Sequence, residues 1–376
     1  MVFLKKKKTI VFFSGFYLPH LGGVERYTDN LGRHMIKNNY NVFVVTSNYG
    51  DLKDEDVLDG MKIIRLPIYN IFKNRYPIVK KNKKFKSLMQ KLDNLDIDAV
   101  VVNTRFHLTS LIGSKYAKRR GIPVFLIEHG SQHLTVDNKI LDFFGLIYEH
   151  LLTIKVKKYV DYAYGVSEGA SKWLKHFNIN SDGVWYNSIN EFGNGVPLKK
   201  NGKILNITYA GRILKQKGID RLIESFLRLD RDGIRLNIAG DGNLLSSLKN
   251  RYGNNKKISF LGKLDFDELI KLYAKTDIFV YAPIWPEGLP TAILEAGYMK
   301  CAVIASPYGG TKEIIINKKN GIMIENEDEL VEALNLLIND KNLRAKYSLK
   351  LFNDVNKKFL WKSTCKKIMR DIDEKI

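Results

Sequence analysis

Two glutamates in the segment PEGLPTAILEA have carboxylates that can bind different parts of one extended ligand. Glu287 falls in the loop after an apolar strand, and Glu295 falls on the following helix, because Pro290 suits a first helical turn. One carboxylate can accept hydrogen bonds from sugar hydroxyls and the other from ribose hydroxyls. The backbone amides of Gly288 and Leu289 are available to phosphate oxygens. The alternative is a glutamate favoured by the helix dipole, with Glu295 solvated.

Two cations precede this pair in the segment GRILKQKG, which follows an apolar strand and comes before a helical stretch. Gly211 lets the chain turn, and Arg212 and Lys217 stand where the helix N-terminus begins. A nucleotide-sugar diphosphate needs cationic side chains and backbone N–H groups at a helix start, and the departing diphosphate gains negative charge in the transition state. An arginine and a lysine in such a loop are also commonly solvated, so these two alone do not decide the function.

Apolar runs of strand length alternate with helix-like stretches along the whole chain. In the first half the runs fall at 9–16, 40–47, 61–67, 97–103, 123–128 and 162–167. In the second half they fall at 204–210, 234–240, 258–262, 277–283, 301–306 and 321–324. Near-continuous apolar strands that alternate with helices indicate buried parallel sheets. These strands are too many for one ordinary doubly wound sheet, so we predict an α/β fold with two Rossmann-like domains.

The domain boundary is expected within 190–203, a segment rich in glycine, asparagine and lysine. We predict an N-terminal domain at 1–195, a C-terminal domain at 196–355, and a helix at 356–376 that packs back toward the N-terminal domain. Ligands of open α/β sheets bind at the carboxyl ends of the strands, so two domains that face one another place the active site in a central cleft.

From about 204 to 316 the chain resembles the retaining GT-B glycosyltransferases of family 4, also called group 1 glycosyltransferases. The resemblance is carried by YAGRILKQKGIDRLIESF, IAGDG, ISFLG, DIFVYAPIWPEGLPTAILEAGYMKCAVIAS and GGTKEII, in that order. Arg212 and Lys217 match the family's diphosphate-binding pair. Glu287 and Glu295 match its E-x7-E pair, whose first member contacts the donor sugar and whose second contacts the ribose. The resemblance thus implies a nucleotide-sugar-binding C-terminal domain and an N-terminal domain on the acceptor side.

The first half matches the same family more loosely. PHLGGVERYTDNLGRHM resembles its glycine-rich loop and helix after the first strand, where Gly22 and Gly23 would let the backbone approach the donor phosphates or the acceptor. An ordinary tight turn is the alternative. PVFLIEHG places His129 where the family often has a histidine facing the transferred sugar. A histidine after a strand is also commonly structural, and His107 and His133 are competing candidates.

The resemblance implies a metal-independent enzyme without a cofactor, in which the nucleotide sugar is a co-substrate. Asp-x-Asp pairs occur ahead of a strand core, in a turn and near the chain end, at Asp96/Asp98, Asp230/Asp232 and Asp371/Asp373. None of these positions suits a metal loop, and the histidines and cysteines show no metal-ligand spacing. The two cysteines, Cys301 and Cys365, give no disulfide framework. This cysteine usage predicts a reducing, cytoplasmic location.

The chain has 376 residues, is 45% hydrophobic and 27% charged, and carries a formal net charge of +21. These values are typical of a globular protein and exclude a disordered one. The apolar run 9–18 is interpreted as a buried strand, since no signal-peptide cleavage site follows it, and no segment is predicted to span a membrane.

Within 61–91 there are ten Lys or Arg and no Asp or Glu. The lysines alternate with Ile71, Phe72, Tyr76, Ile78, Val79, Phe85, Leu88 and Met89. This pattern predicts peripheral binding to an anionic membrane, at the inner face of the cytoplasmic membrane. The alternative is lysine on solvated faces, favoured by an AT-rich genome. No nucleic-acid-binding motif accompanies the charge, so no nucleic-acid partner is predicted.

Together these features predict a retaining glycosyltransferase that moves a sugar from a UDP- or GDP-linked donor to the hydroxyl of a glycan or lipid-linked acceptor. Assembly of a cell-surface polysaccharide or glycolipid is the expected setting. A GT-B nucleotide-sugar epimerase or phosphorylase would use a similar site. A degenerate transferase that acts only as a binding protein is a further alternative, which the intact set Arg212, Lys217, Glu287 and Glu295 disfavours.

Overall fold

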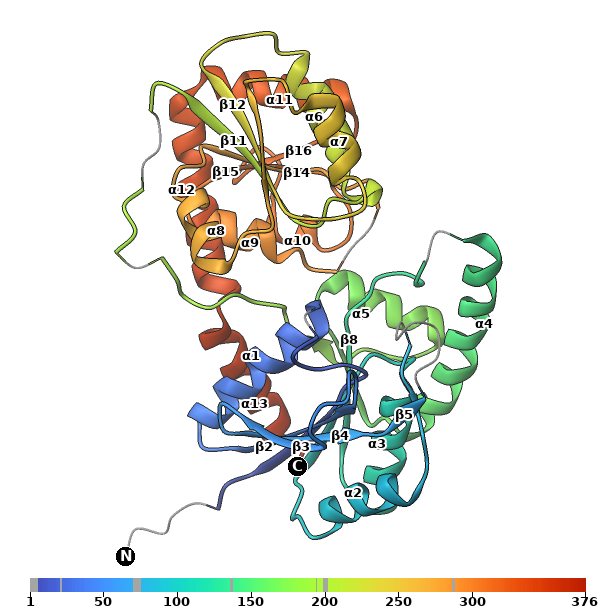
Figure 1. The fold of residues 1–376 in the computed structure, drawn as a ribbon. Coiled ribbons are helices and arrows are strands. Elements are labelled where there is room, and N and C mark those ends of the chain that lie inside the picture. The colour runs from blue at the N-terminus through green and yellow to red at the C-terminus, as the bar shows by residue number, and fades with distance from the viewer. Residues whose placement is uncertain are drawn as a thin grey trace, which may run out of the picture. The chain divides into compact units, whose positions relative to one another are not determined.

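A computed structural model describes residues 6–20, 22–69, 76–135, 138–193, 195–198, 202–285 and 288–376. The chain forms two compact units (Figure 1). The first unit consists of Met1–Asn187 with Trp361–Ile376, and the second consists of Ser188–Leu360. The units divide after 187 and 360, whereas the segments expected from the sequence end at 195 and 355. Among the described residues, no helix combines the length and apolar composition that crossing a membrane requires.

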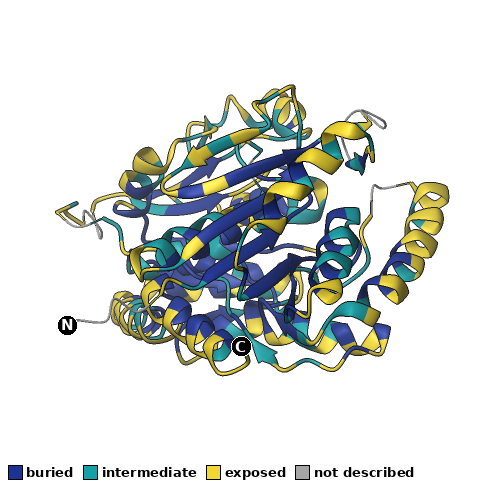
Figure 2. Cartoon of the chain, turned by 90° about the horizontal axis from the view of Figure 1, so that it is seen from below, coloured by how far each residue is buried: buried dark blue, intermediate teal, exposed yellow. Residues whose placement is uncertain are grey.

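The first unit is built on an eight-stranded sheet with the order β10-β9-β8-β7-β1-β2-β4-β3. Only β3 pairs antiparallel with its neighbour. The strands are β1 (Thr9–Phe13), β2 (Asn41–Ser47), β3 (Glu55–Leu58), β4 (Met61–Leu66), β7 (Ala99–Asn103), β8 (Val124–Glu128), β9 (Tyr162–Gly165) and β10 (Gly183–Val184). Every residue of β1, β7 and β8 is buried (Figure 2). Strands buried on both faces read as continuous apolar runs, which is why the sequence predicts them.

Helices cover both faces of this sheet, and they are α1 (Gly23–Lys37), α2 (Lys83–Asp93), α3 (Leu108–Arg119), α4 (Lys139–Val156), α5 (Glu168–Leu174) and α13 (Trp361–Asp373). The described residues of the unit also form two short 3-10 helices, η2 (Lys157–Tyr159) and η3 (Lys175–Phe177), and the ladder of β5 (Ile68–Tyr69) with β6 (Ile78–Val79). Successive β1 side chains enter opposite cores. One core is shared with α1 and α13, and the other with α2 and α3.

The C-terminal helix α13 is an integral part of the first unit. Trp361 is buried against Tyr27 of α1, with 4.9 Å between ring centroids. Asp371 accepts a hydrogen bond of 2.9 Å from the indole nitrogen of Trp185. The end of the chain therefore closes the core that contains Phe12.

The second unit has a six-stranded sheet in which all strands are parallel. Its order is β13-β12-β11-β14-β15-β16, so the strand sequence reverses between β11 and β14. The strands are β11 (Leu205–Ala210), β12 (Ile234–Ala239), β13 (Ile258–Gly262), β14 (Ile278–Tyr281), β15 (Ala302–Ala305) and β16 (Ile322–Met323). The predicted α/β fold with two parallel-sheet domains is confirmed.

The helices of the second unit are η4 (Lys215–Lys217), α6 (Ile219–Leu227), α7 (Leu245–Tyr252), α8 (Phe266–Tyr273), α9 (Thr291–Tyr298), α10 (Thr311–Ile314), α11 (Glu327–Asn339) and α12 (Lys341–Lys358). On α6 the buried face carries Ile219, Leu222, Ile223 and Phe226, as the apolar spacing predicts. On the other face of the sheet α9 packs between β14 and α12. Because the strand order reverses between β11 and β14, the helices that follow these strands, α6 and α9, both start at the reversal point.

Candidate functional site

The reversal of strand order in the second unit brings the predicted cations and the second glutamate to one edge of the sheet. At such a switch point the helices after two neighbouring parallel strands leave toward opposite faces of the sheet, and ligands of open α/β sheets bind there. Lys217 follows β11, and its Nζ donates a 3.3 Å hydrogen bond to the hydroxyl of Tyr281, the last residue of β14. The same Nζ lies 5.6 Å from the Tyr281 ring centroid. Lys217 therefore reaches across from one strand to the next.

Backbone contacts hold the loop of Lys217 in place. Gly218 has a φ of +66°, and a Cβ there would lie 2.0 Å from the carbonyl oxygen of Ala282. The N–H of Ile284 donates a 3.0 Å hydrogen bond to the carbonyl of Gln216. The loops after β11 and β14 are thus in direct backbone contact, and only glycine fits at 218.

Arg212 is exposed at the start of the same loop. Its carbonyl accepts a 2.8 Å hydrogen bond from the Tyr209 hydroxyl. The loop also packs closely against the end of β12, since a Cβ at Gly240 would fall 1.8 Å from the carbonyl oxygen of Gly211. The backbone is therefore fixed on two sides while the guanidinium remains accessible.

Glu295 lies on α9, the helix that follows β14, and its carboxylate is half-buried. The buried hydroxyl of Tyr273 donates to it over 3.3 Å. Burial, and next the charge of Glu295, raises the pKa of Tyr273 well above its usual value. Tyr273 hence stays protonated and keeps donating, which orients the carboxylate.

The loop between β14 and α9 contains the remaining donor-side candidates. Pro290 is the N-cap of α9, and Leu289 is buried. The carbonyl of Gly288 accepts a 3.0 Å hydrogen bond from the N–H of Gly310, where a Cβ would lie only 2.8 Å from that oxygen. Glu287, together with Pro286, lies outside the described residues, so its predicted role stays a prediction.

In the first unit the switch point lies between β1 and β7, and His129 follows the adjacent strand β8. Its Nε2 lies 2.9 Å from Oδ1 of Asn103, the last residue of β7. The amide nitrogen of Asn103 donates to the Thr28 hydroxyl over 3.0 Å, which directs Oδ1 toward the histidine. Nε2 of His129 is therefore the protonated nitrogen, and Nδ1 can accept.

The environment keeps His129 neutral. Its ring packs edge-on against Tyr27, with 5.0 Å between centroids. Desolvation, and to a lesser degree the neighbouring His107, lowers the pKa of His129 to about 3. At neutral pH this histidine offers hydrogen bonds without a positive charge.

The two competing histidines lie in different surroundings. His107 is the N-cap of α3 and stacks on Tyr76 with 5.5 Å between centroids, and burial lowers the pKa of His107 to about 4. A Cβ at Gly15 would fall 2.5 Å from Nδ1 of His107, so this close packing needs the glycine. His133 instead donates from Nδ1 to the carboxylate of Glu149, 2.7 Å away, in a separate cluster.

Gly22 and Gly23 form the N-terminus of α1. Gly22 is the N-cap, and a Cβ at Gly23 would meet none of the described atoms within 4 Å, so the backbone of Gly23 is open to approach. The buried carboxylate of Glu25 lies in the same turn, and its Oε1 is 3.5 Å from Nδ1 of His20. A carboxylate at this helix end repels a phosphate but can accept from a hydroxyl.

Behind His129 lies a buried ion network that the sequence analysis did not identify. Arg105 is fully buried, and its guanidinium donates to Glu128 over 2.7 Å and to Glu149 over 3.1 Å. The second oxygens of these carboxylates accept from the N–H groups of Gly130 and Leu134, at 2.9 Å and 3.0 Å. The network thus fixes both ends of the loop that begins with His129. A charged residue at the end of an apolar run, as in PVFLIE, is the signal that would have pointed to it.

Two family models match the chain, one in each half. The model described as Glycosyltransferase Family 4 matches residues 21–191, and the model described as Glycosyl transferases group 1 matches residues 195–350. The chain belongs to the group 1 glycosyltransferases.

The matches to relatives and to solved structures cover most of this glycosyltransferase. An uncharacterised glycosyltransferase of Methanocaldococcus jannaschii is 29% identical over 381 residues, covering 96% of this chain and 97% of the relative. The O-antigen biosynthesis glycosyltransferase WbnH of Escherichia coli is 25% identical over 330 residues, covering 85% and 88%. The crystal structure of Anabaena HepE in complex with UDP has a TM-score of 0.76 at 15% identity, covering 98% and 100%. The predicted GT-B fold class is thereby confirmed.

Replacing Gly218 with alanine should destabilise the second unit of this glycosyltransferase. The left-handed backbone and the contact with the Ala282 carbonyl should together cost at least about 1 kcal/mol. The measurement is urea unfolding of the purified variant. Gly202→Ala is the control, because among the described atoms its Cβ would approach only the carbonyl oxygen of Ile204, at 3.8 Å. This variant should change the free energy of unfolding by less than about 0.5 kcal/mol. Equal stability of the two variants would show that the two loops are not in contact.

Replacing Arg105 with methionine should leave two buried carboxylates without their cation and destabilise the first unit by about 3–5 kcal/mol. Lys118→Met is the control, because the exposed pair of Lys118 with Asp161 should contribute less than about 1 kcal/mol. Unfolding can be followed by tryptophan fluorescence, since three of the four tryptophans belong to the first unit. A similar small effect for both variants would contradict the assigned network.

Proposed function

We propose that this glycosyltransferase transfers a sugar from a UDP- or GDP-linked donor to an acceptor hydroxyl with retention of the anomeric configuration. The observation that carries the proposal is the position of Lys217 and Glu295 after the two strands that flank the switch point of the second unit. Lys217 and the exposed Arg212 would bind the diphosphate, and Glu295 would accept from the ribose hydroxyls. The complex of the structural neighbour HepE with UDP supports a uridine nucleotide.

Glu287 is proposed to orient and stabilise the donor sugar. In the transfer the acceptor oxygen attacks the anomeric carbon from the face of the leaving group, and the bond from that carbon to the β-phosphate oxygen breaks. The nucleoside diphosphate departs with the electron pair, and its phosphate takes the acceptor proton. Cations at Arg212 and Lys217 stabilise the negative charge that develops there. The proposed reaction requires neither a metal ion nor a cofactor.

The first unit is proposed to supply the neutral His129 and the start of α1 at Gly22 and Gly23, which is open at Gly23. Nδ1 of His129 would accept from a hydroxyl of the transferred sugar, since Nε2 is engaged with Asn103. Glu25 disfavours a phosphate at the start of α1, so we assign this end to an acceptor hydroxyl. The donor phosphates are then bound by the second unit alone.

Replacing Lys217 with alanine should weaken UDP- or GDP-sugar binding at least tenfold, because a charged hydrogen bond to phosphate contributes about 1.5–3 kcal/mol. Lys215→Ala is the matched control, since Lys215 is exposed in the same 3-10 helix. Binding is measured by thermal shift with UDP-, GDP- and ADP-sugars, and turnover by release of nucleoside diphosphate with candidate acceptors.

Glu287→Ala should abolish turnover in the same assay while the protein remains folded. Normal donor consumption by the Lys217 or Glu287 variant would contradict the site. Donor consumption that needs inorganic phosphate, or interconversion of the sugar without an acceptor, would indicate a phosphorylase or an epimerase. Binding of a nucleotide sugar without turnover, whichever acceptor is supplied, would indicate a non-enzymatic binding protein.

The membrane surface predicted at 61–91 needs revision, because several of its apolar side chains are used inside the fold. Val79 and Leu88 are buried, and Phe85 and Met89 pack against the same core. Residues 70–75, which include Ile71 and Phe72, lie outside the described residues. Val79, Leu88, Phe85 and Met89 therefore belong to the core and cannot enter a bilayer.

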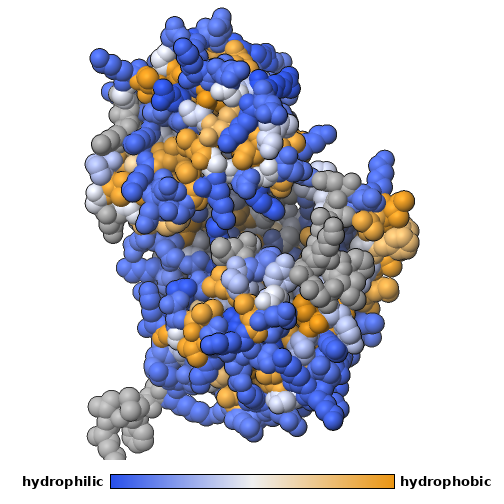
Figure 3. Space-filling model, viewed as in Figure 1, coloured by the Kyte–Doolittle hydropathy of each residue, from blue (hydrophilic) through white to orange (hydrophobic). Residues whose placement is uncertain are grey.

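Exposed apolar side chains gather instead on α4 (Figure 3). They are Ile140, Leu141, Phe143, Phe144, Leu146, Ile147, Tyr148, Leu151 and Ile154, of which the first four are 56–69% exposed. We propose that α4 binds an anionic membrane that carries a lipid-linked acceptor. The first unit has 34 Lys and Arg against 20 Asp and Glu, so its charge suits anionic headgroups. The role of WbnH in O-antigen biosynthesis is consistent with such an acceptor.

The double variant Phe143→Ser, Phe144→Ser should bind anionic vesicles at least tenfold more weakly, because each phenylalanine contributes about 1.5–3 kcal/mol when it leaves water. Phe266→Ser is the matched control, since Phe266 is 51% exposed in the second unit. Co-sedimentation with phosphatidylglycerol vesicles at rising salt measures the affinity. Unchanged vesicle binding by the double variant, or no binding by the parent chain at low salt, would contradict the proposal that α4 binds the membrane.

A further inference from the structure

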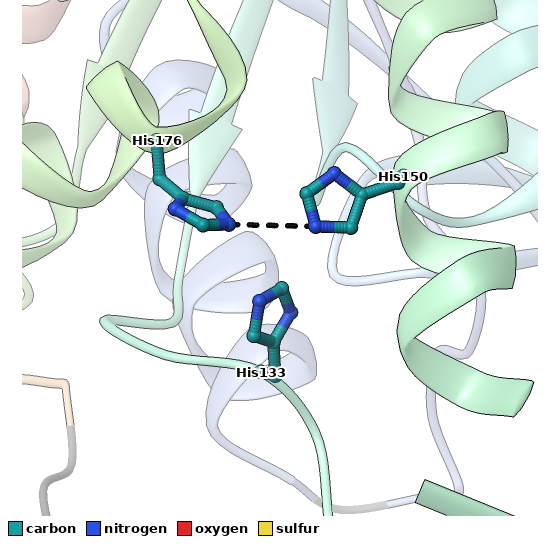
Figure 4. A group of neighbouring side chains, drawn as sticks. All are labelled: His133, His150 and His176. Atoms are coloured by element: carbon teal, nitrogen blue, oxygen red, sulfur yellow. Dashed lines mark hydrogen bonds between the residues drawn. The ribbon is translucent and has the colours of Figure 1, made fainter. Parts of the chain in front are cut away.

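Three of the seven histidines of the chain lie together in the first unit, outside the site described above. His133 comes from the loop after β8, His150 from α4, and His176 from η3. One ring nitrogen of each lies within 4.8 Å of the others, and the three rings face a common space (Figure 4). They are distant from one another in sequence, so the fold alone brings them together.

The spacing of two of these rings matches a shared metal ion. Nε2 of His150 and Nε2 of His176 are 3.4 Å apart. Two imidazole nitrogens bound to one tetrahedral zinc ion at about 2.0–2.1 Å lie about 3.3 Å from each other. His133 needs to move by up to about 1.5 Å, from at most 4.8 Å to about 3.3 Å between nitrogens, which a half-buried side chain in a loop can do by a small rotation.

The third ligand is already oriented by a buried carboxylate. Nδ1 of His133 is 2.7 Å from Oε2 of Glu149, which is 3% exposed. A hydrogen bond from Nδ1–H leaves the lone pair on Nε2, the nitrogen that a metal would use. Metal-binding histidines in proteins very commonly have such a carboxylate partner. Arg105 holds Glu149 in turn, 3.1 Å away, so the carboxylate is fixed on both sides.

Aromatic neighbours also hold two of the three rings in place. The indole of Trp173 stacks on His176, with 4.6 Å between centroids, and Phe177 packs beside His150 at 4.9 Å. These aromatic contacts limit how far the two rings can turn away from each other.

We propose that His133, His150 and His176 bind one divalent transition-metal ion of the Zn²⁺ class, with water in the remaining tetrahedral position. The ion would join the loop after β8, α4 and η3, and so tie the base of the exposed helix α4 to the body of the unit. This site is structural and takes no part in sugar transfer, so it does not depend on the proposed function.

The test uses the full chain, freed of any affinity tag, stripped with a chelator and dialysed. Calorimetric titration with ZnCl₂ should give one site per chain, and CoCl₂ should give the visible absorption of a tetrahedral ion with nitrogen ligands. His150→Gln and His176→Gln should each weaken Zn²⁺ binding at least tenfold and remove the cobalt spectrum. His34→Gln, which alters a histidine of α1 outside the cluster, should leave both unchanged.

Stability provides a second readout that does not depend on activity. Zn²⁺ should raise the melting temperature of the parent chain and of the His34 variant, and should not raise that of the His150 or His176 variant. Circular dichroism of the metal-free variants shows whether they fold. Folded cluster variants that bind Zn²⁺ as tightly as the parent chain would overturn the proposal, as would a parent chain that binds no Zn²⁺.

Discussion

Parallel strand pairing is the constraint on which both units depend. It places the carboxyl ends of all central strands at one edge of each sheet, and where the strand order reverses, the helices after two neighbouring strands leave toward opposite faces of the sheet. In the second unit the loop after β11 contains Lys217, and the loop after β14 leads into α9, the helix that carries Glu295. Because the strands are buried on both faces, their side chains are committed to packing. The residues that bind ligands therefore lie in the loops and helix starts. There Gly218 lets the loop after β11 approach the loop after β14, which brings Lys217 to Tyr281.

The first unit adds a second constraint, the buried charge of Arg105. A fully buried guanidinium is tolerated only with carboxylates in contact, and here Glu128 and Glu149 take that role. The same carboxylates accept from backbone N–H groups at both ends of the loop that begins with His129. One ion network thus positions the histidine proposed to meet the sugar and the histidine proposed to bind a metal. Loss of the network would affect both, although the two sites serve different purposes.

Much of the fold follows from the sequence because buried parallel strands leave continuous apolar runs. Such runs as TIVFF and VFLIE predict β1 and β8, whereas short edge strands such as β10 carry no comparable pattern. The donor-side candidates can be predicted from the sequence because Arg212, Lys217 and Glu295 lie in contiguous motifs. The histidine cluster cannot be predicted in this way, since its members are separated by whole secondary-structure elements. Membrane binding by the segment 61–91 stays a prediction, but helical spacing turns Leu88 of α2 inward, which a count of charges does not reveal.

The most direct measurement of the central claim is a crystal structure of the full chain with UDP or GDP bound. The diphosphate should lie at the carboxyl edge of β11 and β14, within hydrogen-bond distance of Nζ of Lys217 and of the Arg212 guanidinium. The ribose hydroxyls should donate to the carboxylate of Glu295. A nucleotide found away from this edge, or bound only by residues of the first unit, would contradict the assignment of the second unit as the donor-binding unit.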